Sequence, residues 1–486
     1  MTCSHSAHAE HLFPPHLLHA AWLEFAAKGY AQPVTGVIYR GEPRPTCGMP
    51  LGGLDTGCLD IEPNGMLGYC TLFNHLVHPR LLLNLPFLGL HCEGRTWVLV
   101  SDRQGKEDRP VHNESIVTVP STDYTPRYFD VGLEGVEIAD SIDYWGHFPI
   151  LDMECNTAAP VEVGLRAWSP FIPGDAVTSM LPGAVFELSF RNPGPERRQG
   201  CLAFSFPGFG LPPEEDNTSG TPVQRQVLEG ALNGVLVESN GDDAWEMSYV
   251  LAAVQQEGVR YGGPLNTDGP AWAAIARRLP EVGEQETGTT LALDFDLAPG
   301  EAWTRSLVLA WHAPNFKAGG APSHANTHTF THMYARHYPD ALAAARTLTE
   351  ERETLLQRII AWQEAIYYAP EIPGWLADSL INILHLIPEC SIWGQARAPL
   401  GPWCRAEDGL FGMNECPRGC PQIECLPCSF YGNIPLVYFF PEAALSTLRG
   451  YKAYQFEDGR PPWIFGGVTA RDEENKPPYE LSRPDK

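Results

Sequence analysis

Residues 407–425, EDGLFGMNECPRGCPQIEC, bring together side chains of types that can do chemistry. Carboxyl groups stand on Asp408, Glu415 and Glu424, and a carboxylate can act as a nucleophile or exchange a proton with a substrate. The segment also holds cysteines, whose thiolates are ligands for zinc. Two interpretations are therefore open: a loop that presents a catalytic carboxylate, and a metal-binding knuckle.

The cysteines of this region follow the spacing C-x3-C-x4-C-x2-C, and they are Cys416, Cys420, Cys425 and Cys428. Only the last pair has the spacing that is usual in zinc knuckles, although four thiolates this close in sequence can close a tetrahedral site. Buried or reduced thiols and a disulfide are the alternatives. A structural zinc ion is thus a candidate, and no cofactor is required for carboxylate chemistry.

The elements that position this segment begin with many short strands. Residues 31–315 show alternating, β-branched and aromatic runs separated by turn residues, which predicts a large antiparallel β-sandwich. Residues 1–30 are expected to form a tail with a short helix. The predicted strands include 34–40, 96–101, 184–194, 200–208 and 234–241, with a further pair within 291–314.

The pattern changes after residue 315. Residues 316–369 are expected to form a polar linker followed by one long connecting helix from about residue 338. Two further helical stretches follow, 373–390 and 429–455, and the second of these is expected to break near Phe440–Pro441 because proline interrupts helical hydrogen bonding. The segment 407–425 is therefore predicted to be a loop between two helices.

The charge and composition of the chain limit the kinds of partner that it can bind and the compartment in which it is expected. The formal net charge of −26 would repel a phosphate backbone or an anionic membrane surface, so no nucleic-acid partner is expected. No run of eighteen apolar residues and no basic, apolar leader occurs, so neither a transmembrane segment nor a signal peptide is expected. The 13 cysteines without export signals favour reduced thiols and a cytoplasmic location.

Four stretches, taken together and in this order, resemble glycoside hydrolase family 116, the non-lysosomal glucosylceramidase-like β-glucosidases. CGMPLGGLDTGCLDIEPNG (47–65) resembles a glycine-rich element of the family, with Asp55 where the family usually has glycine. PVEVGLRAWSPFIPGDAVTSMLPGAVFELSFRN (160–192) resembles a sandwich segment. EIPGWLADSLINIL (371–384) is similar to the start of the family's helical domain, and 408–442 is similar to its nucleophile region.

The resemblance implies a mixed fold, in which the sandwich is followed by an (α/α)6 catalytic barrel, of which residues 370–486 would be the first part. It also implies hydrolysis of β-glycosides with retention of configuration, which needs two carboxyl groups about 5–5.5 Å apart. Alignment places the nucleophile at Glu415, with Glu424 as the alternative. The family's general acid/base falls beyond Lys486, so residues 1–486 are expected to be inactive alone, with Asp408 as an alternative partner.

Aromatic residues near the loop are candidates for binding a carbohydrate or glycolipid substrate. Sugar rings present apolar C–H faces that pack on aromatic rings, and Trp393, Trp403 and Tyr431 are the candidates in the nucleophile region, with Trp375 and Trp463 nearby. Packing in the core or at an interface is the alternative for each tryptophan. The family's H-F-Y is S-F-Y here, and its preceding D-V is replaced, so some sugar contacts of the family are lost or supplied otherwise.

The glycines of PLGGLDTG (50–57) predict a tight turn beside the sandwich rather than a phosphate loop, since no helical pattern and no lysine follow them. The resemblance places this turn in the interface that reaches toward the catalytic cleft. Two other functions stay open for the chain: a non-catalytic carbohydrate-binding or scaffold protein, and an interaction module stapled by zinc.

Overall fold

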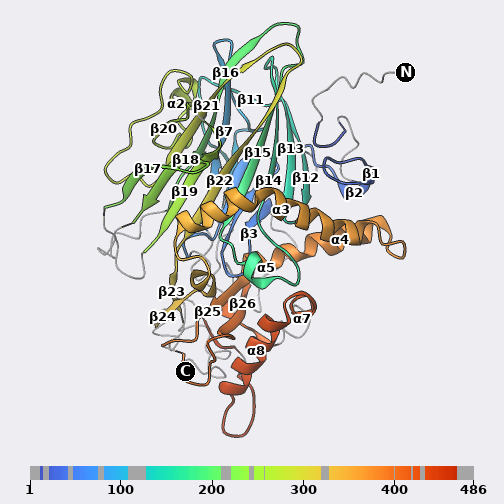
Figure 1. The fold of residues 1–486 in the computed structure, drawn as a ribbon, viewed down its shortest axis with the longest axis vertical. Coiled ribbons are helices and arrows are strands. Elements are labelled where there is room, and N and C mark those ends of the chain that lie inside the picture. The colour runs from blue at the N-terminus through green and yellow to red at the C-terminus, as the bar shows by residue number, and fades with distance from the viewer. Residues whose placement is uncertain are drawn as a thin grey trace.

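The computed structural model describes residues 11–14, 21–41, 47–74, 81–107, 127–209, 221–239, 246–256, 258–318, 328–398, 400–416, 420–426, 433–462 and 464–467. β-Strands are the main regular structure of these residues, and one long helix crosses them (Figure 1). A second group of strands and short helices lies below the sandwich in the figure and holds the C-terminal part of the chain.

Two large sheets form the body of the protein. The first has the order β11 (Glu137–Ile138), β8 (Arg95–Val98), β7 (Leu88–Cys92), β16 (Arg198–Phe206), β21 (Thr289–Leu297) and β20 (Arg260–Gly262). The second has the order β12 (Ser141–His147), β13 (Ile150–Asn156), β14 (Glu162–Trp168), β15 (Gly183–Arg191), β22 (Ala302–His312), β19 (Ser248–Val254), β18 (Leu232–Glu238) and β17 (Val223–Glu229). Apart from the parallel β11–β8 pair, neighbouring strands in both sheets are antiparallel.

The inner faces of these sheets share one hydrophobic core. Leu202 and Phe204 of β16 belong to the same buried cluster as Phe186 and Leu188 of β15, and the rings of Phe186 and Phe204 meet edge to face with centroids 4.8 Å apart. Burial of this apolar area drives the two sheets together. The large antiparallel β-sandwich expected from the strand pattern is present.

The outer face of the eight-stranded sheet is covered by α3 (Ala341–Tyr367), which crosses it in Figure 1. Leu348, Leu355 and Ile359 of this helix are buried with outward-facing strand residues. A Cβ atom at Gly183 of β15 would lie 2.3 Å from Cδ1 of Leu348, so only glycine permits this close approach. The helix begins at Asp340, whose side chain accepts a hydrogen bond from the Ala343 amide.

The remaining strands form smaller sheets. One four-stranded sheet has the order β3 (Met49–Gly52), β4 (Cys58–Ile61), β5 (Met66–Cys70) and β6 (Leu81–Pro86). Another, called the C-terminal sheet below, has the order β25 (Ser391–Gly394), β26 (Leu410–Cys416), β27 (Cys420–Ile423) and β28 (Gly466–Gly467). Three two-stranded sheets pair β1 (Trp22–Phe25) with β2 (Val34–Val37), β9 (Gln104–Lys106) with β10 (Tyr128–Asp130), and β23 (Asn315–Ala318) with β24 (His328–Thr331).

The short helices are α1 (Ala176–Ser179), α2 (Gly269–Ala273), η3 (Met333–Arg336), α4 (Gly374–Asn382), η4 (Ile383–His385), α5 (Leu386–Cys390), α7 (Ile434–Phe439) and α8 (Pro441–Ala453). The predicted helix break near Phe440–Pro441 is confirmed by the junction of α7 and α8. Among the helices described, none has the length and apolar character needed to cross a bilayer.

Two segments near the domain boundaries contain strands. In the described part of residues 1–30, Trp22–Phe25 form β1, which pairs with Val34–Val37 as an antiparallel ribbon. Residues 1–10 and 15–20 lie outside the described residues, so the short helix expected within 1–30 stays a prediction. The polar linker expected after residue 315 begins instead with the hairpin β23–β24, in which Phe316 and Phe330 stand opposite each other with stacked rings.

The expectation of a loop between two helices is wrong for residues 410–416 and 420–423. Leu410–Cys416 form β26, which pairs with β25 on one side and with β27 on the other. The glycines and prolines in this stretch suggested turns, but Gly412 lies inside β26, where a Cβ atom would lie 2.9 Å from Cγ2 of Ile423. The residues that could do chemistry therefore stand on or beside a sheet.

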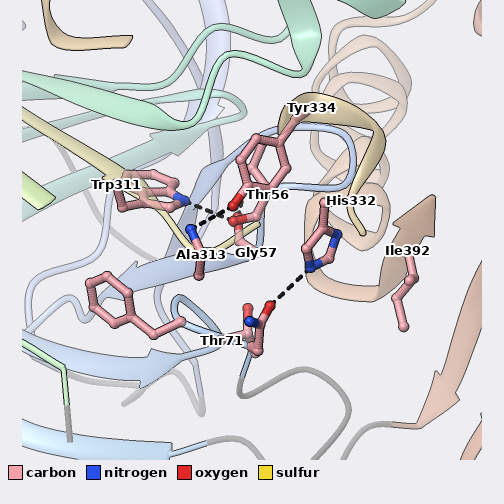
Figure 2. A pocket seen from close by; sticks show the side chains of 10 residues that line it. Thr56, Gly57, Thr71, Trp311, Ala313, His332, Tyr334 and Ile392 are labelled. Atoms are coloured by element: carbon pink, nitrogen blue, oxygen red, sulfur yellow. Dashed lines mark hydrogen bonds between the residues drawn. The ribbon is translucent and has the colours of Figure 1, made fainter. Parts of the chain in front are cut away.

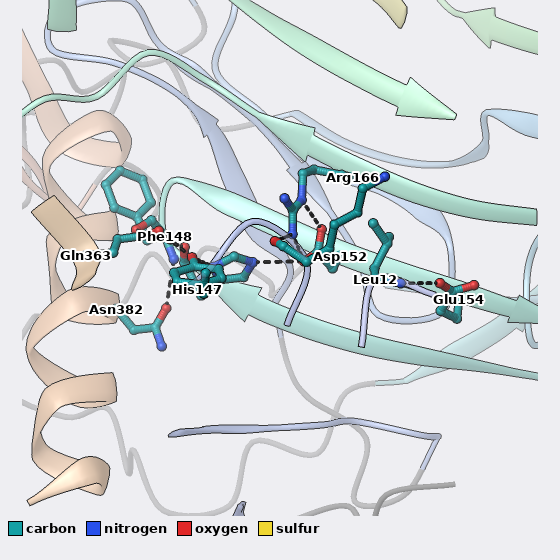
Figure 3. A network of polar contacts seen from close by, with 10 residues as sticks. Leu12, His147, Phe148, Asp152, Glu154, Arg166, Gln363 and Asn382 are labelled. Carbon is teal, nitrogen blue, oxygen red and sulfur yellow. Dashed lines mark hydrogen bonds and ion pairs between the residues drawn. The ribbon is translucent and has the colours of Figure 1, made fainter. Parts of the chain in front are cut away.

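A buried polar network fastens α3 and α4 to the sandwich (Figure 3). Nε2 of Gln363 in α3 donates to the backbone oxygens of His147 and Phe148, at 2.7 and 2.9 Å. The Phe148 amide in turn donates to Oδ1 of Asn382 at the end of α4, at 3.0 Å. These bonds satisfy backbone groups at the β12–β13 turn and fix both helices against it.

The charged centre of this network is the pair Asp152–Arg166, both fully buried within neighbouring strands. Nε and Nη2 of Arg166 donate to the two carboxylate oxygens of Asp152 at 2.8 and 2.7 Å. Burial alone would raise the pKa of Asp152, but the Arg166 guanidinium and a hydrogen bond with His147 outweigh it and hold that pKa at about 2.

Replacement of Asp152 by asparagine is expected to destabilise the fold by about 3–5 kcal/mol at neutral pH, because it leaves the Arg166 charge buried without a partner. Since the folded pKa of Asp152 lies below its ordinary value of 3.8, its contribution is full above about pH 4 and is lost as the pH falls through about 2. Urea unfolding of the wild type and Asp152→Asn at several pH values measures this.

The matched control is Asp296→Asn, which removes a carboxylate from an exposed pair with Arg197. This change is expected to leave the unfolding midpoint at its wild-type value. Equal stability of Asp152→Asn and the wild type near pH 7 would show that the buried pair does not hold the network together.

Candidate active site

The turn between β3 and β4 reaches from the sandwich to the C-terminal sheet. This turn is the predicted tight turn of PLGGLDTG, and it holds Asp55 in the left-handed region with φ 67° and Gly57 with φ 70°. A Cβ atom at Gly53 would lie 2.0 Å from the backbone oxygen of Ser179, so the turn packs directly on the backbone at the end of α1. Glycine is favoured at a left-handed position, yet this chain places an acid there.

The carboxylate of Asp55 explains the exception, because it accepts hydrogen bonds from elements far along the chain. The Trp393 amide in β25 donates to Oδ1 at 2.6 Å, and the Tyr334 amide in η3 donates to Oδ2 at 3.3 Å. The Asp55 amide donates to Oγ of Ser391 at 2.9 Å. A single buried side chain thus joins the sandwich turn to the first strand of the C-terminal sheet.

A histidine completes this cluster. Nδ1 of His332 lies 2.7 Å from Oδ1 of Asp55, and its Nε2 lies 2.9 Å from Oδ1 of Asn74. Complete burial raises the pKa of Asp55, and the charge and hydrogen bond of His332 together with the two backbone donors oppose that rise. The pKa of Asp55 stays above its ordinary value, and these partners hold its carboxyl group in place.

The pocket beside this cluster is part of the scaffold (Figure 2). Its lining includes Thr56, Trp311, His332, Tyr334 and Ile392, and its space is about that of one water molecule. Two bonds brace its wall: Nε1 of Trp311 donates to the backbone oxygen of Thr56 at 2.8 Å, and the Ala313 amide donates to the Tyr334 hydroxyl at 2.7 Å. A sugar ring does not fit in this space.

The backbone of Glu415 lies in β26 at an irregular point of the ladder. Asn414 stands opposite Ile423 and Cys416 stands opposite Cys420, so one residue of β26 faces two residues of β27 between these pairs. Such bulges bend a strand and redirect a side chain, and they are frequent beside active sites. The Glu415 side chain lies outside the described part of the structure.

The structure describes both the backbone and the side chain of Glu424, and this residue is completely buried. It follows β27 with φ 59° in the left-handed region. Its Oε2 accepts a hydrogen bond from the Met413 amide at 2.9 Å, and its Oε1 accepts one from Nδ2 of Asn433 at 3.0 Å. Its backbone oxygen accepts a bond from the Tyr451 hydroxyl at 3.0 Å. The carboxylate of Glu424 thus joins β26 to Asn433 before α7, and its backbone oxygen joins the end of β27 to α8.

Asp408 stands at the other end of β26. Its carboxylate oxygens pair with Nε of Arg405 and Nη1 of Arg449, each at 2.5 Å. Strand β26 alone places Leu410 about 16 Å from Glu415, given about 3.3 Å per residue, and Asp408 precedes it. The two carboxyl groups of a retaining glycosidase stand about 5–5.5 Å apart. The extended strand therefore separates the backbones of Asp408 and Glu415 by more than this distance, and the described geometry gives Asp408 no support as the alternative partner.

The aromatic candidates differ in their surroundings. Trp393 is buried in β25, where its Nε1 donates to the Asp408 backbone oxygen at 2.7 Å and its ring meets Phe411 edge to face. Trp393 is 3% exposed, so the described structure gives no support to its predicted contact with a sugar. Trp403 is partly buried against Tyr454, with ring centroids 5.6 Å apart. Tyr431 lies outside the described residues.

The four cysteines are described unevenly. Cys425 is buried beside Ile464. Cys416 and Cys420 stand opposite each other in the β26–β27 ladder, but their side chains and the whole of Cys428 lie outside the described residues. Zinc binding by these cysteines stays a prediction.

Some members of the cluster gave little signal in the sequence. The sequence distinguishes Asp55 only as an acid where the family that it resembles has glycine, and the left-handed backbone of Asp55 explains that preference for glycine. His332 lies in a stretch expected to be a linker, and nothing in its local sequence indicates its contact with Asp55. Trp463 lies outside the described residues.

The family of the chain follows from its match to a known protein-family model. A family model described as beta-glucosidase 2, glycosyl-hydrolase family 116 N-term, matches residues 48–355, well over half of the chain. The chain belongs to glycosyl-hydrolase family 116. The match covers both large sheets and ends within α3, so β25–β27 and their carboxylates follow the matched family 116 region.

Two solved structures show a distant likeness to the chain. A putative kojibiose phosphorylase from the human microbiome shares 10% identity, with a TM-score of 0.39 over 89% of this chain and 46% of that one. A family GH92 α-mannosidase from Bacteroides thetaiotaomicron shares 11% identity, with a TM-score of 0.33 over 87% of this chain and 50% of that one. The family 116 chain thus spans about half the length of each.

Loss of the Asp55 carboxylate is expected to loosen β25 and β26. Asp55→Ala leaves the buried Trp393 and Tyr334 amides without acceptors, which is expected to cost about 2–4 kcal/mol. Hydrogen exchange of Ser391–Gly394 and Leu410–Met413 should speed up, and Asp55→Asn should lose less stability because asparagine tolerates the left-handed region and keeps one acceptor oxygen.

Glu93→Ala is the control, since Glu93 also has a left-handed backbone, φ 52°, but an exposed side chain in the β7–β8 turn. Exchange in β25 and β26 should stay at the wild-type rate in this variant. Wild-type exchange rates in Asp55→Ala would contradict a role of Asp55 in holding the C-terminal sheet.

Proposed function

We propose that the chain carries the sandwich and the nucleophile strand of a retaining glycoside hydrolase that acts on β-linked glucosides, either soluble or attached to a lipid. Membership of family 116 over residues 48–355 supports glycoside hydrolysis. The observation that carries the assignment to a residue is the bulge in β27 opposite Glu415, a residue of β26, whose strand pairs with β25 and with β27.

Glu415 is proposed as the nucleophile, with Glu424 in a positioning role. A nucleophile must reach the anomeric carbon of its substrate, whereas Glu424 is fully buried and both of its carboxylate oxygens accept hydrogen bonds from the protein. By bonding the Met413 amide, Glu424 steadies β26 two residues before Glu415. The proposal therefore gives the two glutamates different tasks on one hairpin.

The general acid/base is proposed to lie outside residues 1–486, in further helices of an (α/α)6 barrel. Support comes from the apolar surface of α7 and α8, where Ile434, Val437, Tyr438, Leu445 and Leu448 are 47–82% exposed. A helical face of this kind is usually covered by neighbouring helices. In the proposed enzyme these neighbouring helices complete the barrel and close the sugar-binding site. The reducing cytoplasm is the proposed location of the protein.

Mutation of the two glutamates separates their roles. In an enzyme that includes the complete barrel, Glu415→Gln is expected to lower kcat for an aryl β-glucoside by at least about a thousandfold. Glu424→Gln is expected to keep kcat within about tenfold but to destabilise the fold by about 1–3 kcal/mol, because one acceptor oxygen is lost. Steady-state kinetics and thermal unfolding of both variants measure these effects.

Azide provides a check that depends on the nucleophile alone. In Glu415→Gly, azide can enter the space of the missing carboxylate and attack the anomeric carbon from that side, which yields the α-glucosyl azide from a β-glucoside. Recovery of activity with azide is expected for Glu415→Gly and not for Glu424→Gly. The reverse result, or full activity of Glu415→Gln, would contradict the proposal, as would hydrolysis by residues 1–486 at the rate of the complete enzyme.

A further inference from the structure

Two exposed tryptophans stand side by side at the edge of the protein, away from the β25–β27 sheet. Trp22 of β1 is 51% exposed and Trp375 of α4 is 53% exposed, with ring centroids 6.5 Å apart and planes at 66°. By contrast, Trp97, Trp145, Trp168, Trp272 and Trp311 are fully buried. About half of each indole surface in this pair remains in contact with water, so each ring contributes less to the stability of the fold than a fully buried tryptophan does.

The pair is held in a fixed geometry. Nε1 of Trp22 donates to Oδ2 of Asp378 at 2.9 Å, and Oδ1 of the same carboxylate accepts from Nδ2 of Asn382 at 3.0 Å. Asp378 lies one helical turn after Trp375 and is 6% exposed. The helix therefore carries one indole and, through Asp378, orients the other.

Packing of β2 against the start of α4 fixes the distance between the two elements. A Cβ atom at Gly374 would lie 2.2 Å from Oγ1 of Thr35, so the first residue of α4 touches β2 directly. Since β2 pairs with β1, the position of α4 also sets the position of Trp22. A binding surface that is already ordered loses little conformational entropy when a ligand arrives.

A carboxylate flanks the aromatic rings. Glu24 lies two residues after Trp22, so strand alternation puts both side chains on one face of β1, and both are exposed. Among the described residues, Glu24 makes no hydrogen bond or ion pair. The surface thus combines two aromatic faces with an acceptor for hydroxyl groups.

We propose that Trp22 and Trp375 form a carbohydrate-binding platform, separate from the candidate active site, which stacks on the pyranose rings of a neutral oligosaccharide while Glu24 accepts bonds from its hydroxyl groups. This inference rests on the proposed function in carbohydrate chemistry. The apolar C–H face of a pyranose matches an aromatic ring, and its hydroxyl rim matches a free carboxylate. A net charge of −26 favours a neutral ligand over an anion.

A second copy of the chain is a poorer occupant. In a two-fold contact the same patch faces itself, so Glu24 of one copy would approach Glu24 of the other. Like charges brought together without a cation oppose such a contact. The same carboxylate is no obstacle to a sugar.

Isothermal titration of the chain with cellohexaose, a neutral β-linked glucose oligomer, tests the platform. Trp375→Ala is the main variant, because the Trp375 indole donates no hydrogen bond among the described residues and its loss should leave the fold intact. Affinity is expected to fall at least about tenfold in Trp375→Ala and in Trp22→Ala, and a few-fold in Glu24→Gln. Tyr438→Ala, which removes an 82% exposed aromatic of α7, should bind like the wild type.

Several outcomes would overturn the platform. They are wild-type affinity in both tryptophan variants, no measurable binding to the wild type, and a dimer in sedimentation experiments that the tryptophan changes dissolve. Kinetics of the complete enzyme keep the two failures apart. If Trp22→Ala and Trp375→Ala bind cellohexaose like the wild type while Glu415→Gln loses hydrolysis of an aryl β-glucoside, the platform is wrong and the proposed function stands.

Discussion

The contact between the Asp55 carboxylate and the Trp393 amide is the interaction on which the candidate active site depends. It crosses from the tip of the β3–β4 turn in the sandwich to the first strand of the C-terminal sheet. Because hydrogen bonds from Tyr334 and His332 hold the same carboxylate, its position is set from three directions. The register of β25 and β26 then carries this constraint to Glu415.

This arrangement gives the family 116 sandwich a mechanical role in the proposed enzyme. The two large sheets form a rigid body with one shared core, and α3 closes the outer face. The buried bonds of Gln363 and Asn382 fix where the chain leaves α3 and α4. The helices and the turn that holds Asp55 thus fix the position of β26, the proposed nucleophile strand, relative to the sandwich. A catalytic group needs such precise positioning.

The sequence predicts well the elements whose patterns are local. The strands of β15, β16 and β22 show long apolar or alternating runs, and α3 has helical spacing and an aspartate cap, so their existence follows from residues close in the chain. The family resemblance carried by 47–65 and 160–192 is likewise a local pattern, and the family match confirms it.

The site was harder to predict because its bonds are long-range. β26 contains glycine and is followed by cysteines and prolines, and it becomes a strand only by pairing with residues 391–394 and 420–423. The burial of Trp393 and Glu424 depends on partners that no local pattern identifies. Asp408 looked close to Glu415 in sequence, but an extended strand turns a short separation in sequence into a long distance in space.

The most direct test of this account is to trap the glycosyl-enzyme intermediate of the complete enzyme with an activated 2-deoxy-2-fluoro-β-glucoside, and to locate the label by peptide mass spectrometry. The fluorine slows the second step of a retaining mechanism, so the sugar stays on the nucleophile. The account predicts a single fluoroglucosyl group on Glu415. A label on Glu424, or an enzyme that turns over β-glucosides without ever carrying the label, would contradict it.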